Sequence, residues 1–302
     1  MKLLKIKRII VSMKTSDLRI AFFGTPELAV YVLEELGEAN IIPALIVTPP
    51  DRPAGRKLEP TPPPVKIWAI ENDIEYIQSS SLKEPGGLEL LTMCDWDVFI
   101  VAAYSFLMPD WVLKIPQHGV LNVHPSLLPK LRGPSPVRTA IRDDLKDEVG
   151  VSIIELDEQV DHGPIVAQAR IELPVWPEKG HVLDEILFRE GGRLLVEVLP
   201  KWIHGEIKPE EQKHEEATMS HKFIKAEGEI KLGDNPYKNY LKFCAHDGWP
   251  GTFFFQDCNG RRMRVKVTEA EYVNGRFNIL RVIPEGRHEI KFEEWEQTCE
   301  AT

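Results

Sequence analysis

Asn122 and His124 stand two positions apart in the segment GVLNVHPSLLPKLRGPSP, which covers residues 119–136. Alternate side chains of a strand project from the same face, so the apolar run that ends here places both groups together. Pro125 favours an extended backbone at His124. An amide N–H and an imidazolium N–H directed at one point can stabilise negative charge that develops only in a transition state. The pair therefore predicts an oxyanion-stabilising site; the alternative is a histidine that serves only the fold.

A second group of chemically active side chains lies in the segment GVSIIELDEQVDHGPIVAQARIEL. Two strand-like runs flank a loop that contains Asp157, Glu158 and Asp161. A carboxylate beside His124 could orient the imidazole ring, stabilise its protonated form and take the proton that an attacking amine sheds. By composition alone, the same loop is also what a solvated hairpin turn would contain.

The residues before these groups indicate the elements that position them. The strand-like run LRIAFF is followed by Thr25 and Pro26, which predict an N-cap and a first-turn proline for a helix over ELAVYVLEELGE. The apolar runs IIPALIVT, DVFIVAAY and GVLNVH alternate with helical stretches. This interleaving predicts an α/β fold with an open, doubly wound, mostly parallel sheet, which binds ligands beyond the carboxyl ends of its strands. The segment FFGTPE lacks the GxGxxG spacing, so a dinucleotide site is only weakly indicated.

The pattern changes near residue 222, where short strand-like runs with turn residues begin: GTFFFQD, RRMRVKVTEAEYV, RFNILRVIPEG and HEIKF. Such runs predict a small C-terminal β-barrel, similar to an OB-fold. The predicted organisation is therefore a tail or an alternative start at Met13 (residues 1–17), an α/β domain (18–204), a polar linker (205–220) and a C-terminal β-barrel domain (221–302).

The composition is that of a soluble globular protein, with 43% hydrophobic and 28% charged residues in 302 positions. A formal net charge of -10 argues against a surface that attracts nucleic acid everywhere. The run RRMRVKV nevertheless gathers Arg261, Arg262, Arg264 and Lys266. These residues form either a local basic patch or the solvated face of a strand.

The cysteines and the apolar runs indicate whether the protein has a metal site, many disulfides or a membrane span. Cys94, Cys244, Cys258 and Cys299 lie far apart, which suggests neither a zinc site nor a dense disulfide framework. No apolar run reaches the roughly 18 residues that a membrane span requires, and the charges near the start are too closely spaced for a signal peptide. We therefore expect a cytoplasmic protein without a metal ion or a membrane contact. We also expect a monomer, although none of these patterns bears on the oligomeric state.

Together, the two chemically active segments resemble the sequence signature of a known protein family. NVHPSLLPKLRGPSP, followed at this distance by LDEQVDHGPIV, resembles the folate-dependent formyltransferase family, whose signature is an Asn-x-His-x-Ser-Leu-Leu-Pro segment and a later aspartate in a loop before a strand. The resemblance implies a Rossmann-like fold and a formyl transfer from 10-formyltetrahydrofolate to an amine. It implies that Asn122, His124 and Asp161 are the catalytic residues.

The resemblance also implies a folate site against the strand before the catalytic segment, against that segment and against the aspartate loop. Backbone amides suit the edges of a flat pterin ring, and apolar side chains suit its faces. For the stretch VAAYSFLMP the alternative is a buried strand that runs into a helix cap. The candidate folate contacts are Tyr104, Ser105, Phe106, Leu107, Ser126, Leu127, Leu128, Pro129, Val160, His162 and Gly163.

The segment PPDRPAGRKLEPTPPPVK resembles the loop with which some family members enter the acceptor stem of methionyl initiator tRNA. This resemblance implies a role in translation initiation, with RNA contacts by Arg52, Arg56 and Lys57, to which we add Arg261, Arg262 and Arg264. The alternative for the loop is a proline-stiffened surface loop with incidental charges.

Two other functions remain open: formylation of a nucleotide-linked amino sugar, and tRNA binding without catalysis. The basic DRPAGRK loop argues against the first, and the intact Asn122, His124 and Asp161 argue against the second. The chain departs from the family pattern at Leu232, where an aromatic residue is common, and in the neutral charge balance of residues 221–302. Both departures concern how tRNA would be held.

Overall fold

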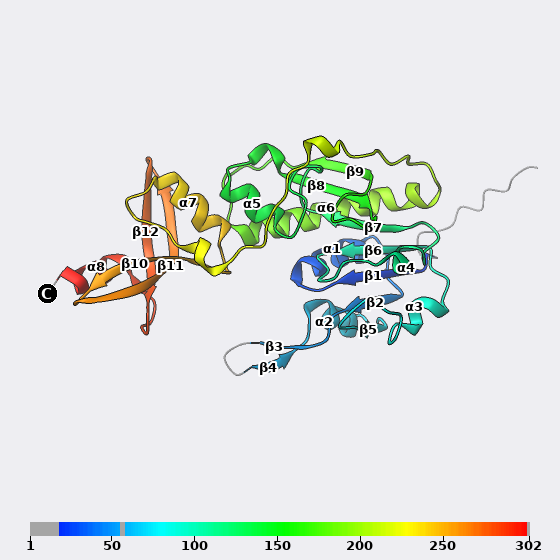
Figure 1. Ribbon diagram of the computed structural model, residues 1–302, viewed down its shortest axis with the longest axis horizontal. Coiled ribbons are helices and arrows are strands. Elements are labelled where there is room, and N and C mark those ends of the chain that lie inside the picture. Colours follow the sequence, from blue (N-terminus) through cyan, green and yellow to red (C-terminus); the bar gives the residue numbers. More distant parts are fainter. Residues whose placement is uncertain (1–17, 55–57, 301–302) are drawn as a thin grey trace, which may run out of the picture. The chain divides into compact units, whose positions relative to one another are not determined.

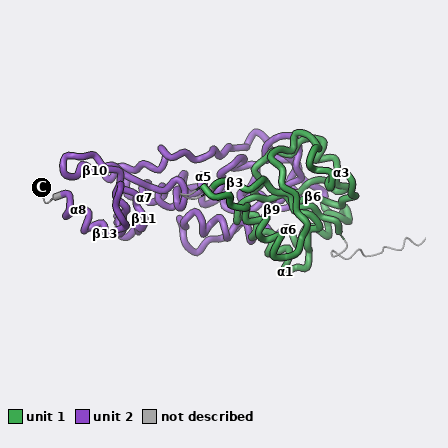
Figure 2. Tube along the Cα trace, turned by 90° about the horizontal axis from the view of Figure 1, so that it is seen from below, with its two compact units in different colours: residues 1–121, 195–207 green, residues 122–194, 208–302 purple. Residues whose placement is uncertain are grey.

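The computed structural model describes residues 18–54 and 58–300 (Figure 1). The predicted tail, residues 1–17, and the predicted RNA contacts Arg56 and Lys57 lie outside the described residues. Contacts within the chain define two compact units (Figure 2): unit 1 comprises residues 1–121 and 195–207, and unit 2 comprises residues 122–194 and 208–302. The predicted domain boundaries fall elsewhere and stay a prediction.

A seven-stranded sheet forms the α/β part of the fold, with the strand order β5-β2-β1-β6-β7-β8-β9. The pairs β1–β2, β1–β6 and β2–β5 are parallel, and β8 pairs with β9 in the antiparallel direction. The prediction of an open, mostly parallel sheet is therefore confirmed. The strands are β1 (Ile20–Gly24), β2 (Leu45–Thr48), β5 (Tyr76–Gln78), β6 (Val98–Ala102), β7 (Val120–His124), β8 (Gly150–Glu155) and β9 (Ile165–Arg170).

Helix α1 (Glu27–Glu38) illustrates how the apolar pattern produces an element. Its buried positions include Ala29, Val30, Val32, Leu33 and Leu36, a spacing that forms one apolar stripe along a helix. The helix covers the predicted stretch ELAVYVLEELGE, but Pro26 occupies the N-cap position, without a side-chain hydrogen bond. The prediction that Thr25 caps this helix was wrong. Thr25 instead accepts a hydrogen bond at Oγ1 from Ser105 Oγ, at 3.1 Å.

Helix α6 has 24 residues, which belong partly to unit 1 and partly to unit 2. Strands β3 and β4 pair with each other and form a two-stranded ribbon within unit 1. The bounds are β3 (Arg52–Ala54), β4 (Glu59–Thr61), α2 (Pro64–Glu71), α3 (Glu89–Met93), α4 (Asp110–Leu113), α5 (Pro136–Arg142), the 3₁₀ turn η2 (Lys146–Glu148), α6 (Gly180–Ile203), and the 3₁₀ turns η3 (His214–Glu216) and η4 (Lys225–Gly228).

Strand β7, which carries the predicted catalytic pair, is buried along its whole length. A strand covered on both faces has no alternation of apolar and polar positions, which explains its nearly uninterrupted apolar sequence. In unit 2, helix α6 packs closely against this strand at Gly191. A Cβ atom on Gly191 would lie 2.4 Å from Val123 Cγ1, so only glycine permits this approach.

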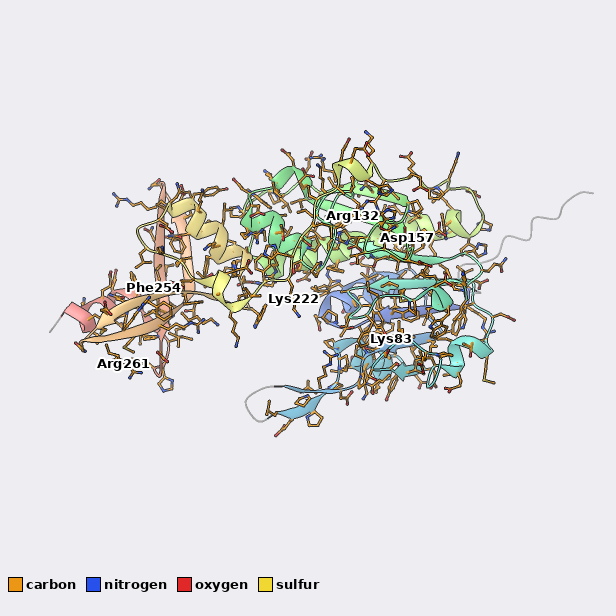
Figure 3. The ribbon with its side chains drawn as sticks, in the orientation of Figure 1. Lys83, Arg132, Asp157, Lys222, Phe254 and Arg261 are labelled. Atoms are coloured by element: carbon orange, nitrogen blue, oxygen red, sulfur yellow. A yellow bond between two sulfur atoms is a disulfide. The ribbon has the colours of Figure 1, made fainter. Side chains whose placement is uncertain are left out.

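The C-terminal part of unit 2 contains an antiparallel sheet with the order β10-β11-β12-β13. Its apolar face contributes Phe254, Val265, Val267 and Val282 to the core, together with Trp295 (Figure 3 labels Phe254). The prediction of a β-rich C-terminal part is confirmed, whereas the OB-like barrel stays a prediction. The bounds are β10 (Thr252–Cys258), β11 (Arg261–Val273), β12 (Arg276–Pro284), β13 (Ile290–Lys291), α7 (Pro236–Ala245) and α8 (Phe292–Glu300).

A disulfide joins Cys258, at the end of β10, to Cys299 in α8. The two cysteines lie 41 positions apart, so their spacing does not reveal the pair. Within residues 18–54 and 58–300, each helix is too short or too polar to cross a membrane. The same residues contain no group of three or more His, Cys, Asp or Glu side chains placed to hold a metal ion.

Candidate active site around Asn122, His124 and Asp161

Asn122 and His124 both lie on β7, where 8% and 4% of their surfaces are exposed. Their two-residue spacing on a strand places both side chains on one face. Asp161 lies in the loop between β8 and β9 and turns toward this face. One oxygen of its carboxylate, Oδ1, is 3.5 Å from His124 Nδ1 and 3.4 Å from Asn122 Nδ2. The structure thus brings the three predicted side chains together, and their catalytic roles stay a prediction.

The imidazole ring of His124 is held from both sides. Its Nε2 atom lies 3.1 Å from the carbonyl oxygen of Leu131. A carbonyl oxygen only accepts hydrogen bonds, so Nε2 carries a proton and donates it. Nδ1 consequently faces the Asp161 carboxylate across the longer 3.5 Å contact. Nδ1 is therefore the ring nitrogen that can reach a substrate atom, with the Asp161 carboxylate beside it.

The other oxygen of the Asp161 carboxylate, Oδ2, accepts a hydrogen bond from the backbone N–H of Gly133, at 2.7 Å. Two loops therefore meet at this side chain. Asp161 has a φ of 48°, in the left-handed region that aspartate tolerates better than most residues. Next to it, a Cβ atom on Gly163 would lie 1.9 Å from the carbonyl oxygen of Glu155. Glycine at position 163 is thus required for the loop to fold back on the end of β8.

The other two carboxylates of the acidic loop, Asp157 and Glu158, have different surroundings. Asp157 accepts a hydrogen bond from the backbone N–H of Gln159 at 2.8 Å and pairs with His162 Nδ1 at 2.6 Å. Glu158 is exposed. Asp161 is therefore the loop carboxylate that contacts His124 among the described residues.

Thr218 and Ser220 support the site and were missed by the sequence analysis. The backbone N–H of Leu131 donates to Thr218 Oγ1 at 2.9 Å, and Ser220 Oγ donates to the carbonyl oxygen of Arg132 at 3.0 Å. Both belong to the predicted linker, residues 205–220, and they hold the loop that presents the Leu131 carbonyl to His124. Their composition carries no signal, because polar side chains are equally expected in a solvated linker.

The first group of predicted folate contacts lies after β6, in unit 1. The hydroxyl oxygen of Tyr104 is buried and lacks a hydrogen-bond partner among the described residues, and burial raises the pKa of this hydroxyl. The Tyr104 and Phe106 rings meet edge to face at 5.6 Å, and 70% of the Leu107 surface is exposed. An apolar surface beside an unpaired buried hydroxyl fits a flat, polar-edged ring such as a pterin.

The second group of predicted folate contacts lies in unit 2 and is mostly engaged within the protein. Ser126 Oγ donates to the carbonyl oxygen of Lys130 at 2.7 Å, and the backbone N–H of Leu128 donates to Ser152 Oγ at 3.1 Å. Val160 is more open, with 43% of its surface exposed. The burial of the remaining members varies: Leu127, Pro129 and His162 are half-buried, and Gly163 is buried.

The described residues of the predicted RNA contacts lie on two separate sheets. Arg52 is exposed on β3 of unit 1, and Arg261 and Arg262 are exposed on β11 of unit 2 (Figure 3 labels Arg261). The guanidinium groups of Arg262 and Arg264 lie over the rings of Phe255 and Phe253, at 4.6 and 3.8 Å from the ring centroids.

Arg264 and Phe253 also line a pocket of about 510 Å³, together with Lys225, Ala226, Trp249 and Pro250. Trp249 exposes 57% of its surface. The pocket thus combines positive charge with aromatic faces, a combination that suits nucleic-acid phosphates and bases.

Comparisons with known proteins identify the family of the chain. The Formyl transferase family model matches residues 18–199. The chain is 43% identical over 238 residues to a methionyl-tRNA formyltransferase of Chloroflexus aurantiacus, covering 79% of this chain and 76% of that protein. It is 37% identical over 297 residues to a methionyl-tRNA formyltransferase of Thermus thermophilus, covering 92% of this chain and 95% of that protein.

The fold is also similar to that of HypX from Aquifex aeolicus, solved in complex with tetrahydrofolic acid. The TM-score is 0.62 at 17% identity, and the match covers 92% of this chain and 46% of that chain. The matched family model spans β1 to β9 and therefore includes the strand and the loop that carry Asn122, His124 and Asp161. The chain therefore belongs to the Formyl transferase family.

Proposed function

We propose that the protein transfers a formyl group from 10-formyltetrahydrofolate to the amino group of methionyl initiator tRNA, for translation initiation. The observation that carries the proposal is the cluster of Asn122, His124 and the Asp161 carboxylate at the end of β7. The relatives that are 43% and 37% identical are methionyl-tRNA formyltransferases, which supports the choice of acceptor.

The three side chains fit the charges that formyl transfer develops. The bound folate supplies the formyl group. Asn122 donates an amide N–H to the formyl oxygen as this oxygen gains negative charge, while the amine attacks the formyl carbon. His124 stabilises the same charge from Nδ1. The carboxylate of Asp161, 3.5 Å from that nitrogen, accepts the proton that the amine releases. As the bond between the formyl carbon and the folate nitrogen breaks, that nitrogen takes up a proton, so tetrahydrofolate leaves and the formyl group stays on the amine.

The folate and RNA contacts follow from the same proposal. Tyr104, Ser105, Phe106 and Leu107 would hold the pterin, with the unpaired Tyr104 hydroxyl as a hydrogen-bonding group. Arg52, Arg261, Arg262 and Arg264 would bind the tRNA backbone, because guanidinium groups pair with phosphate oxygens. We further propose that the protein acts in the cytoplasm as a monomer.

A formyl-transfer assay tests the acceptor directly. The purified protein is incubated with 10-formyltetrahydrofolate that carries an isotope label in its formyl group. Parallel reactions contain methionyl initiator tRNA or a nucleotide-linked amino sugar, and the Asp161→Asn variant is the matched control. We expect label on the tRNA only, and much less of it with the variant. Label on the sugar alone would replace the proposed acceptor, and binding of tRNA without transfer would leave a protein that has lost catalysis.

A further inference from the structure

Gln212 is a buried amide in the polar segment 205–220, with 4% of its surface exposed. Its Nε2 atom donates one hydrogen bond to the backbone carbonyl of Asp161, at 2.9 Å, and another to that of Gly163, at 2.7 Å. One side chain thus bonds the residues on both sides of His162, in the turn that directs the Asp161 carboxylate toward His124. The catalytic loop is held by a side chain about 50 positions further along the chain.

The other end of the Gln212 amide is fixed as well. Its Oε1 atom accepts hydrogen bonds from Arg132 Nε, at 3.1 Å, and from an Arg132 terminal nitrogen, at 2.6 Å. Arg132 is also buried, with 7% exposure, and follows Leu131, whose carbonyl accepts from His124 (Figure 3 labels Arg132). Gln212 therefore bridges the loop that orients His124 and the loop that carries Asp161.

The hydrogen-bonding groups around position 212 explain why a glutamine is suited to it. Two carbonyl oxygens require donors, and two guanidinium N–H groups require an acceptor. Glutamate would keep the acceptor for Arg132 but would place carboxylate oxygens against the two carbonyls. An aliphatic residue would leave both sets of buried groups without partners, which is costly in the interior.

Flanking contacts fix the position of Gln212 itself. Glu210 and Ile165 exchange two backbone hydrogen bonds, at 2.7 and 2.8 Å, which attach the segment to β9 directly after the Asp161 loop. Arg132 also contacts His214 Nδ1 at 2.9 Å, and the His214 ring stacks on His162 at 4.0 Å. The segment therefore contacts the structure on both sides of Gln212.

We propose that Gln212 is a positioning residue, which holds the Asp161 loop in the conformation that places the carboxylate beside His124. The inference rests on the proposed function, because it assigns Gln212 to the same formyl transfer. Gln212 acts through Asp161 and has no contact with the reacting atoms. A displacement of about 1 Å at a catalytic group can cost roughly 100-fold in rate, so loss of this support should be measurable.

The kinetic test compares Gln212→Glu and Gln212→Leu with the control Glu211→Ala, which changes the exposed neighbouring residue. We expect kcat to fall roughly 10-fold to 100-fold for both Gln212 variants, with the KM for the formyl donor and for tRNA changed by less than about twofold. The control should match the wild type. If Gln212→Leu does not fold, Gln212→Glu carries the test, because it keeps the acceptor for Arg132.

A double-mutant cycle separates positioning from a general effect on the fold. Introduced into Asp161→Asn, Gln212→Glu should cause little further loss of kcat, because the group that it positions is already gone. A full additional loss in that background, or a KM effect in place of a kcat effect, would overturn the proposal.

Hydrogen–deuterium exchange provides a readout that does not depend on activity. In both Gln212 variants, amides in residues 157–164 should exchange faster than in the wild type, while those of β8 keep their protection. Unchanged exchange at residues 157–164 would overturn the positioning role even if activity falls. If the wild type transfers no formyl group to tRNA, the proposed function fails, but the exchange result still decides whether Gln212 holds the loop.

Discussion

Asp161 has the most specific environment in the candidate site, since each carboxylate oxygen has an identified neighbour: Oδ2 accepts from Gly133 N–H, and Oδ1 faces His124 and Asn122. The oxygen that faces His124 and Asn122 is thus distinct from the oxygen that ties the loop to Gly133. Substitutions here should therefore separate chemistry from folding.

Asp161→Asn should keep the loop, because the amide oxygen can still accept from Gly133 N–H. It should lower kcat by roughly 100-fold or more, since the proton acceptor and the negative charge beside His124 are lost. Steady-state formyl transfer measures the change, and Glu158→Gln in the same loop is the control. Near-wild-type turnover would contradict the role of Asp161.

Asn122→Ala tests stabilisation of the formyl oxygen. Loss of one oxyanion donor should reduce kcat by roughly 100-fold to 1000-fold, about 2.7 to 4 kcal/mol of transition-state stabilisation. The measurement is kcat and KM as separate quantities. A variant that raises only the KM for the folate donor would make Asn122 a binding residue.

At the scale of elements, the end of α7 contains a buried titratable group within unit 2. His246 is fully buried and donates from Nδ1 to the carbonyl oxygen of Lys242, at 2.9 Å, while its Nε2 atom lacks a partner among the described residues. Burial lowers the pKa of His246, because a charged ring would lose hydration that the protein does not replace. The folded state therefore favours the neutral ring.

This environment predicts a loss of stability at acidic pH. The folded pKa lies below the unfolded value of about 6.5, so the unfolded state binds more protons as the pH falls through that value, and the free energy of unfolding decreases. His246→Gln removes the titrating ring. Urea unfolding between about pH 8 and pH 5 should show a smaller acid-induced loss for the variant than for the wild type. An equal acid-induced loss of the free energy of unfolding in the variant and in the wild type would contradict the prediction.

At the scale of the whole molecule, the net charge of -10 and the proposed RNA partner are reconciled by local clustering. Arg262 and Arg264 extend over Phe255 and Phe253 on one sheet, and Lys225 and Trp249 line the adjoining pocket. Over such a patch the local potential, and not the total charge, governs the approach of a phosphate backbone.

Arg262→Ala and Arg264→Ala should each weaken tRNA binding and reduce the slope of log K against log salt by about one per lost phosphate contact. Titrations at several salt concentrations give this slope, with Arg276→Ala on β12 as the control. Folate binding should not change. An unaltered slope in both variants would remove this patch from the proposed tRNA surface.

Local residue patterns were enough to predict the elements whose cause is local. Continuous apolar runs predicted the buried strands, and the helical stretch ELAVYVLEELGE after Thr25 and Pro26 predicted α1. The shared face of Asn122 and His124 follows from the two-residue period of a strand. The cap of α1 was predicted one residue too early, since Thr25 and Pro26 are both compatible with a helix start and only the backbone chooses between them.

Residue patterns alone left three loop carboxylates open and the family resemblance pointed to Asp161, whereas the contacts that bring Asp161 to His124 are visible only in the folded chain. Asp157, Glu158 and Asp161 look alike in sequence, but the turn at Gly163 and the Gly133 N–H select Asp161. Gln212, Thr218 and Ser220 bond to residues 49 to 88 positions away. Polar composition cannot distinguish such a support from a solvated linker, because the difference lies in which buried donors and acceptors long-range packing brings together.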